Sequence, residues 1–384
     1  MVERQLEKEA LLILTQFPCL GIVGPRQCGK TTLARYIEKK MDRQAIYLDM
    51  ELPSDLQKLS DAETFLKSVE DSLVIIDEVQ RTPHLFPILR ALIDQKRTPG
   101  RFLLLGSASP ELIRDSSESL AGRIAYLEMS GLNSLELGKL VSIDQHWLLG
   151  GFPDAVLNPA SSNVWMKNFI ATYIERDLPL LGLDADPILI RRLWTMVAHQ
   201  HGQLLQWANL AKSLEIDTRT LKRYLLFLEE AYLIRFLQPF HSNLKKRLVK
   251  SPKVYIRDSG ILHYLLGIKT LQDLHGHPQM GNSWEGYVIE QLSQQLDDDY
   301  NLFFYRTHTG AEIDLVLERN GTVESVVEIK YGDSAQPTRG NTEAAETLEV
   351  KRRFLLKANG DTYPTSNNFQ VISLFDFLTG VLKK

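Results

Sequence analysis

The chain has 384 residues, of which 44% are hydrophobic and 24% charged, and its net charge is -4 at pH 7. This length exceeds one ordinary hydrophobic core, so two to four domains are expected. The small net charge excludes a general basic field, so contact with nucleic acid would need a local patch. Cys19 and Cys28 are the only cysteines, which excludes a disulfide framework and a four-cysteine zinc site. The charged N-terminus and the lack of a long apolar segment predict a cytoplasmic protein without membrane contact.

The first third of the chain alternates short apolar segments with helical ones. The apolar segments, each followed by polar residues or glycine, cover residues 19–23, 45–48, 73–76 and 102–105. Helical patterns lie between them, notably at 31–40 and 86–96. This rhythm predicts an α/β fold in which helices cover a parallel sheet.

A phosphate-binding pattern, G-x-x-x-x-G-K-[ST], follows the first predicted strand and opens a helix. Its glycines allow the backbone to wrap phosphates, whose oxygens accept N–H groups at the helix N-terminus. Lys30 is predicted to reach the β- and γ-phosphates of ATP, and the Thr31 hydroxyl to ligate Mg²⁺. The predicted nucleotide-binding residues are Gly24, Pro25, Arg26, Gln27, Cys28, Gly29, Lys30, Thr31 and Thr32.

Two carboxylates, Asp77 and Glu78, end the apolar strand at 73–76. Beside a phosphate loop, Asp77 is expected to bind the metal, and Glu78 to orient and deprotonate the attacking water. Ser107 follows the next strand and is our candidate for sensing the γ-phosphate, although a serine-rich turn is the alternative. Arg123 is a candidate arginine finger or phosphate sensor, acting in cis or in trans, or else a solvated surface residue.

Several segments together resemble the AAA+-like ATPases of bacteria and archaea that carry a fused C-terminal domain. The resemblance extends over nearly the whole chain and implies ATP binding and hydrolysis by a P-loop NTPase core at residues 1–135. A helical lid or linker over 136–201 follows. The segments are residues 24–32, 75–80, 105–107, Leu120-Ala121-Gly122-Arg123, Gly150-Gly151-Phe152-Pro153 and Tyr173-Ile174-Glu175-Arg176-Asp177-Leu178.

Residues 202–256 contain two predicted helices with helix-turn-helix spacing, followed by a basic, strand-like stretch. The turn at 216–218 offers Asp217 or Thr218 as a cap for the second helix. The segment looks like a winged helix, and its basic residues would contact DNA phosphates rather than read bases. A protein–protein module is the alternative. The candidate contacts are Arg219, Lys222 and Arg223 on the second helix, and Lys245, Lys246, Arg247, Lys250 and Lys253 on the wing.

The last region, 257–384, changes from helices to strands, with an Asn320-Gly321 hairpin turn. Period-two alternation allows Asp314 and Glu328 to lie adjacent on antiparallel strands. With Glu285 from a predicted helix they could bind Mg²⁺, and Lys330 would stabilise an attacking hydroxide or the phosphate charge.

This order resembles the PD-(D/E)XK nuclease fold, an α/β restriction-endonuclease-like domain. The resemblance implies that Asp314, Glu328 and Lys330 form the core triad and that Glu285 is the helical carboxylate. A short Gly-x-Glu-Ile-Asp element stands where that fold carries Pro-Asp. A degenerate domain that grips DNA or serves as a scaffold is therefore the alternative to a nuclease.

Three functions remain open from the sequence. The first is a Mg²⁺-dependent ATPase that couples nucleotide state to DNA, with or without cleavage by the C-terminal domain. The second is a regulatory ATPase whose later domains bind protein partners, and the third is a slow nucleotide switch. A homo-oligomer is compatible with each, since an arginine finger acting in trans requires one.

Overall fold

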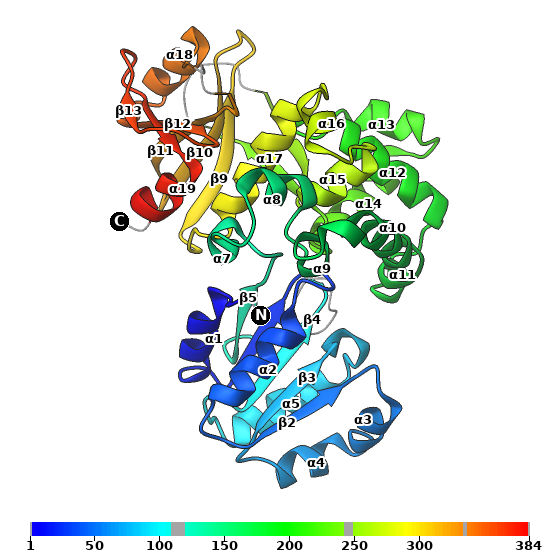
Figure 1. The fold of residues 1–384 in the computed structure, drawn as a ribbon. Helices are drawn as coiled ribbons and strands as arrows, with labels where there is room; N and C mark the ends of the chain where they lie inside the picture. Colours follow the sequence, from blue (N-terminus) through cyan, green and yellow to red (C-terminus); the bar gives the residue numbers. More distant parts are fainter. Residues whose placement is uncertain (1, 109–119, 242–248, 333–335, 383–384) are drawn as a thin grey trace. The chain divides into compact units, whose positions relative to one another are not determined.

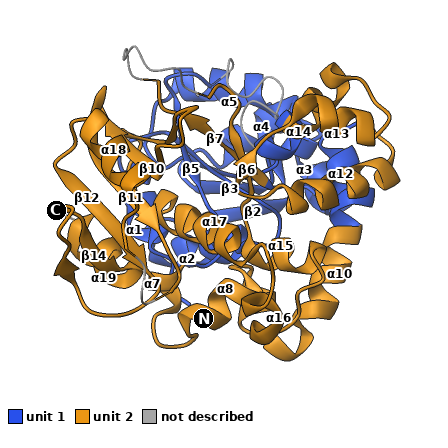
Figure 2. Ribbon diagram, turned by 90° about the horizontal axis from the view of Figure 1, so that it is seen from above, with its two compact units in different colours: residues 1–132, 172–184, 226–233 blue, residues 133–171, 185–225, 234–384 orange. Residues whose placement is uncertain are grey.

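The chain forms two compact units, traced in Figure 1 and coloured separately in Figure 2. A computed structural model describes residues 2–108, 120–241, 249–332 and 336–382. Unit 1 comprises residues 1–132, 172–184 and 226–233, and unit 2 comprises 133–171, 185–225 and 234–384. The finer division at residues 135, 201 and 256 stays a prediction. Among the described residues, no helix combines the length and apolarity that crossing a bilayer requires.

A five-stranded sheet with the order β2-β3-β4-β1-β5 forms the centre of unit 1, and all its strands are parallel. The strands are β1 (Cys19–Val23), β2 (Ala45–Asp49), β3 (Leu73–Asp77), β4 (Phe102–Gly106) and β5 (Ile124–Glu128). The four predicted strands and their parallel arrangement are confirmed. The fifth, β5, was not predicted, although Ile124-Ala125-Tyr126-Leu127 form an apolar run as short as that of β2, and both strands lie at an edge of the sheet.

Helices cover both faces of this sheet, which explains why its central strands are apolar throughout. Leu20 and Ile22 pack on one face with α1 (Leu6–Leu14) and α2 (Lys30–Lys40). Ile76 and other alternate residues pack on the opposite face with two further helices. Successive strand residues point to opposite faces, so both sets must be apolar when both faces are buried. The remaining elements of unit 1 are α3 (Pro53–Lys58), α4 (Ala62–Ser68), η1 (Val79–Arg81), α5 (Leu85–Gln95), η3 (Tyr173–Asp177) and α11 (Leu178–Leu180).

Unit 2 begins with a largely helical region, as the sequence predicted. Its Gly150-Gly151 turn is fixed by Asp258, whose carboxylate accepts the Gly151 N–H at 2.8 Å and caps α15 through the Ile261 N–H at 2.9 Å. The helices are α7 (Ser134–Leu137), α8 (Ile143–Leu149), α9 (Pro153–Val156), η2 (Pro159–Ser161), α10 (Ser162–Thr172), α12 (Pro187–His199), α15 (Ser259–Leu265), α16 (Leu271–His275) and α17 (Met280–Ser293).

The predicted helix pair is present as α13 (Trp207–Ser213) and α14 (Thr218–Glu230). Asp217 caps α14, since its carboxylate accepts the N–H groups of Arg219 at 2.8 Å and of Thr220 at 2.9 Å. The apolar residues on the inner faces of the two helices are buried: Leu210, Ala211, Leu214, Leu221, Tyr224, Leu225 and Leu228. The basic residues predicted to face outward are exposed: Arg219, Lys222 and Arg223. Lys245, Lys246 and Arg247 lie outside the described residues.

A nine-stranded sheet with the order β13-β14-β12-β11-β10-β9-β7-β8-β6 forms the rest of unit 2. The strands assigned to the wing join it directly, because Gln238 of β7 pairs in parallel with Phe303 of β9. The predicted hairpin between β10 and β11 is confirmed, with positive φ angles of 52° at Asn320 and 81° at Gly321. The strands are β6 (Gln203–Leu204), β7 (Ile234–Pro239), β8 (Lys253–Ile256), β9 (Tyr300–Arg306), β10 (Glu312–Arg319), β11 (Thr322–Ile329), β12 (Arg352–Lys357), β13 (Tyr363–Pro364) and β14 (Gln370–Ser373).

Helices cover both faces of this sheet at β10 and β11. Trp284 and Val288 of α17 pack with Leu315 on one face, and Ala344 of α18 (Arg339–Thr347) packs with Val316 on the other. This places β10 and β11 in the interior of unit 2, so polar side chains at their ends are drawn into a buried setting. The chain ends with α19 (Leu374–Asp376) and η4 (Phe377–Val381).

Candidate functional site

The phosphate loop connects β1 to α2 through left-handed backbone at Gly24, Gln27 and Gly29, with φ of 153°, 62° and 104°. A Cβ atom on Gly24 would lie 2.0 Å from the Met129 carbonyl oxygen, so only glycine fits at that position. Helix α2 begins at Lys30, and the N–H groups of its first turn lack partners within the helix. The loop therefore has the geometry of an anion-binding helix N-terminus.

Lys30 is buried and folds back over this loop. Its ammonium group donates to the carbonyl oxygens of Gly24 at 3.0 Å and Pro25 at 2.8 Å. Both partners are neutral carbonyl groups and not carboxylates. A lysine in this state is available to bind the phosphates of a nucleotide.

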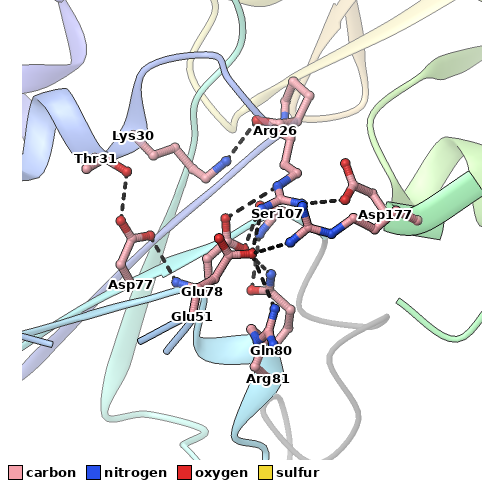
Figure 3. A network of polar contacts seen from close by, with 12 residues as sticks. Arg26, Lys30, Thr31, Glu51, Asp77, Glu78, Gln80, Arg81, Ser107 and Asp177 are labelled. Atoms are coloured by element: carbon pink, nitrogen blue, oxygen red, sulfur yellow. Dashed lines mark hydrogen bonds and ion pairs between the residues drawn. The ribbon is translucent and has the colours of Figure 1, made fainter. Parts of the chain in front are cut away.

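Asp77, at the end of β3, is buried and surrounded by neutral donors (Figure 3). Its Oδ2 accepts hydrogen bonds from the Thr31 hydroxyl at 2.7 Å and from the Tyr47 hydroxyl, and its Oδ1 accepts the Glu78 N–H at 2.9 Å. A hydroxyl and a carboxylate that meet in this way match the protein ligands of Mg²⁺ in P-loop enzymes, where phosphates and water complete the shell. Thr31 and Asp77 therefore fit the ion.

Tyr47 was missed by the sequence analysis. It lies on β2, and its contact with Asp77 depends on the parallel pairing of β2 with β3. Burial and the hydrogen bond to Asp77 raise the pKa of Tyr47, so the hydroxyl stays protonated and donates. The Arg35 guanidinium covers the ring at 3.5 Å from its centroid, which fixes the ring's position.

Glu78 has a left-handed backbone, with φ of 56°, which is uncommon for a residue with a side chain. Its Oε2 accepts hydrogen bonds from the Ser107 hydroxyl at 3.1 Å and from the Gln80 amide. The Arg26 Nε lies 3.6 Å from the other carboxylate oxygen. A strained backbone of this kind persists only where the surrounding contacts hold it in place, and such residues cluster at functional sites. Ser107, predicted to sense phosphate, thus contacts the predicted catalytic base.

Arg26 joins the phosphate loop to a network of carboxylates (Figure 3). Its guanidinium pairs with Asp177 and lies 2.8 Å from Glu51, which Arg176 also approaches at 3.1 Å. Burial alone would lower the pKa of Arg26, but the carboxylates of Glu78, Asp177 and Glu51 outweigh it and raise that pKa. The sequence offered no sign of this contact, because 151 residues separate Arg26 from Asp177.

Arg123 lies at the N-terminal end of the parallel strands, whereas the phosphate loop lies at their C-terminal end. It directly precedes β5, which runs parallel to β1 with Ile124 opposite Cys19, whereas the loop follows the other end of β1. The five-residue strand separates them by about 16 Å. The Arg123 guanidinium instead donates to the two carboxylate oxygens of Asp94 at 2.6 and 2.8 Å. The predicted role in cis does not fit this placement, and the role in trans stays a prediction.

Comparison with known proteins places this geometry in a family. Residues 16–138 match the AAA domain family, and residues 141–272 and 280–377 match two domain families of unknown function, DUF8612 and DUF4143. An uncharacterized protein of Mycobacterium tuberculosis is 40% identical over 368 residues, covering 95% of this chain and 82% of its own length. This chain belongs to the same family. An uncharacterized protein of Mycobacterium bovis matches to the same extent.

A solved structure supports the same fold. The Walker-type ATPase of Pyrococcus abyssi superposes with a TM-score of 0.50 at 16% identity, covering 69% of this chain and 96% of its own. Together with the AAA match, this likeness confirms the predicted P-loop ATPase fold for the N-terminal part of the chain.

A second group of polar residues lines a cavity of about 640 Å³ within unit 2. All four residues of the predicted C-terminal constellation, Glu285, Asp314, Glu328 and Lys330, line it. Glu285 lies on α17, Asp314 on β10 and Glu328 near the end of β11, and Lys330 directly follows β11. The structure therefore brings together residues that lie up to 45 positions apart (330 − 285), as the sequence predicted.

Lys330 and a backbone amide fix the carboxylates of β10 and β11. The Lys330 ammonium lies 2.6 Å from Glu328 Oε1 and 3.8 Å from Asp314 Oδ2. The Ile329 N–H donates to Asp314 at 2.9 Å, and the Asn341 amide, missed by the sequence analysis, donates to Glu328 at 2.9 Å.

Lys253 corrects the sequence interpretation. It was predicted to be an exposed wing residue that contacts DNA, but only 3% of it is exposed. Its ammonium lies 3.0 Å from Glu285 Oε1 and 3.1 Å from Glu312 Oε1, within the cavity. The period-two pattern of β8 could not reveal this, because every residue of that short strand is buried.

The carboxylates of this cavity do not fit Mg²⁺ as they are arranged. Glu285, Asp314 and Glu328, predicted to bind the metal, direct oxygens at lysine ammonium groups rather than at one shared point. Across the described ranges, no group of three or more His, Cys, Asp or Glu side chains is arranged to hold a metal ion.

Proposed function

We propose that this chain hydrolyses ATP with Mg²⁺ and couples the state of the nucleotide to DNA. The observation that supports hydrolysis most directly is the 2.7 Å contact between the Thr31 hydroxyl and the buried Asp77 carboxylate, beside Lys30. This arrangement offers a metal position and a phosphate-binding cation within one loop and one strand end. The AAA match over residues 16–138 agrees with it.

The chain's own residues have separable tasks in this proposal. Lys30 exchanges the carbonyl oxygens of its loop for the β- and γ-phosphates, while Thr31 and Asp77 hold Mg²⁺. The bound ion neutralises charge on the phosphates. Glu78 orients the attacking water and accepts its proton. Ser107 and Gln80 hold the Glu78 carboxylate in position for that transfer.

The DNA part of the proposal depends on the exposed face of α14. Arg219, Lys222 and Arg223 lie on the first two turns of this helix, where helix-turn-helix proteins approach the duplex. Their side chains are long and cationic, so they suit phosphate contact rather than base recognition. A protein partner with an acidic surface is the second candidate for the same face, since charged exposed residues also mediate protein contacts.

Steady-state ATP hydrolysis with Mg²⁺, measured with and without DNA at two salt concentrations, tests this proposal. DNA should stimulate turnover, and the stimulation should fall steeply with salt. The logarithm of the DNA-binding constant falls linearly with the logarithm of the salt concentration. Changing Arg219, Lys222 and Arg223 to Gln should make this slope less steep by about 3.

A matched variant with Lys8, Lys39 and Lys67 changed to Gln loses the same charge from exposed positions in unit 1. It should retain the full salt dependence. Turnover that is indifferent to DNA in the unmodified chain would favour the protein partner. Absence of any turnover in the presence of Mg²⁺ would contradict the proposal as a whole.

A further inference from the structure

The carboxylate cavity of unit 2 already contains a cation of its own. Four carboxylates line it, from Glu285, Glu312, Asp314 and Glu328. The Lys253 ammonium lies within 4.0 Å of the first three, and the Lys330 ammonium within 3.8 Å of the last two. From this geometry we propose that Lys253 is a resident cation of the cavity, beside Lys330, and closes it to divalent metal ions.

The position of Lys253 is fixed by the strand that carries it. β8 is paired on both sides, with Lys253 opposite Leu237 of β7 and Leu204 of β6. The ring centroid of Phe304 lies 5.4 Å from the ammonium, so the side chain extends over an aromatic face toward the carboxylates. A backbone held from both sides directs the ammonium to one place, so it behaves as part of the cavity wall.

The charge of Lys253 is maintained by its partners. Burial alone would lower the pKa of Lys253, but the carboxylates of Glu285, Asp314 and Glu312 outweigh it and raise that pKa. Tyr255 donates a further hydrogen bond to Glu285 at 2.5 Å, which fixes the carboxylate that lies nearest to Lys253. A buried ammonium that lost these partners would be left unpaired, which is strongly destabilising.

A divalent ion would have to compete with this ammonium for the same oxygens. Charges of the same sign a few ångströms apart repel strongly at the effective dielectric of a partly buried site. The ion would therefore have to expel Lys253 at the cost of a buried unpaired charge. It follows that the cavity, as folded, does not support metal-dependent cleavage, even though it gathers the residues that the nuclease resemblance implies.

Binding of Mn²⁺ in the absence of nucleotide tests this proposal. Free Mn²⁺ is measured by electron paramagnetic resonance, and the melting temperature is followed in the same titration. The unmodified chain should show no saturable binding that depends on Asp314. Lys253→Met should bind Mn²⁺ at least about tenfold more tightly and gain thermal stability from it, because the ion replaces the lost charge. Lys253→Met combined with Asp314→Asn should lose that binding.

Lys357→Met is the matched control, since Lys357 is also buried, lies on β12 of the same sheet and is not among the residues that line the cavity. It should show no Mn²⁺ response. If Lys253→Met does not fold, Lys253→Gln removes the same charge while leaving a polar group. The proposal is overturned if the unmodified chain binds Mn²⁺ in a manner abolished by Asp314→Asn, or if folded Lys253 variants gain no binding.

Discussion

The two polar sites of this chain use similar residues in opposite electrostatic states. In unit 1 the Asp77 carboxylate accepts hydrogen bonds from Thr31 and Tyr47, which are neutral, while Lys30 donates to carbonyl oxygens. In unit 2 the Asp314 and Glu328 carboxylates lie against the ammonium group of Lys330. Lys30 and the Asp77 carboxylate therefore have separate, neutral partners in unit 1, whereas Lys330 is paired with carboxylates in unit 2.

This difference shows that the presence of acidic residues near a lysine does not by itself determine a metal site. Carboxylates that are satisfied by neutral donors keep their charge, and an arriving cation meets no competitor. Carboxylates paired with lysine are already neutralised, so an arriving metal ion must first displace the lysine ammonium. Acidic residues near a lysine are therefore compatible with both states, and the position of the ammonium decides between them.

The largest effect is expected at Glu78, the proposed catalytic carboxylate of unit 1. Glu78→Gln should retain ATP binding and lower kcat by at least about 100-fold, because the amide cannot accept the proton of the attacking water. Binding of a fluorescent ATP analogue and steady-state turnover separate the two effects. Glu63→Gln, a change of the same chemistry on an exposed turn of α4, is the control and should leave turnover unaltered. Turnover of Glu78→Gln at the original rate would show that another group is the base.

A second prediction examines a carboxylate of unit 2 whose charge is balanced by arginine. Burial alone would raise the pKa of Glu290, but Arg257 and Arg235 outweigh it and lower that pKa from 4.5 to about 2. The unfolded chain therefore takes up this proton at higher pH than the folded one, so the stability from Glu290 is complete above about pH 5. It is lost as the pH falls from about 4.5 to 2, and it amounts to about 3 kcal/mol.

Glu290→Gln tests this linkage by chemical denaturation at several pH values. The variant should be less stable than the unmodified chain by about 3 kcal/mol at pH 7, and the difference should shrink as the pH falls below 4.5. Glu346→Gln, at an exposed position of α18, is the control and should stay within about 0.5 kcal/mol. A stability difference that is constant with pH would contradict the ion-pair explanation.

The smallest effect is expected from Tyr47, one of the neutral donors to Asp77. Tyr47→Phe removes one hydrogen bond, worth about 1 kcal/mol, and leaves the carboxylate oriented by Thr31 and the Glu78 N–H. The Mg²⁺ concentration for half-maximal turnover should therefore rise by about fivefold with little change in kcat. Tyr36→Phe, on the exposed side of α2, is the control. An unchanged Mg²⁺ dependence would mean that Tyr47 does not position Asp77.

The sequence predicted those parts of the fold that depend on neighbouring residues. Strands β1, β3 and β4 were predicted because a strand buried on both faces is apolar throughout, and the Asn320-Gly321 turn because few residues accept two positive φ angles. The phosphate loop was predicted because its glycines and Lys30 act within one short segment. Strand β5 was missed although its short apolar run matches that of β2, the strand at the other edge of the sheet.

The contacts that decide the chemistry of both sites join residues that are distant in sequence. Arg26 meets Asp177, Tyr47 meets Asp77, and Lys253 meets Glu285, and none of these pairs follows from a local pattern. The sequence by itself determined which charged groups are present and which strand ends carry them. Only the tertiary structure decided which ammonium lies beside which carboxylate. That pairing is set by strand order and register, which bring distant residues into contact and are not encoded in any short segment of the chain.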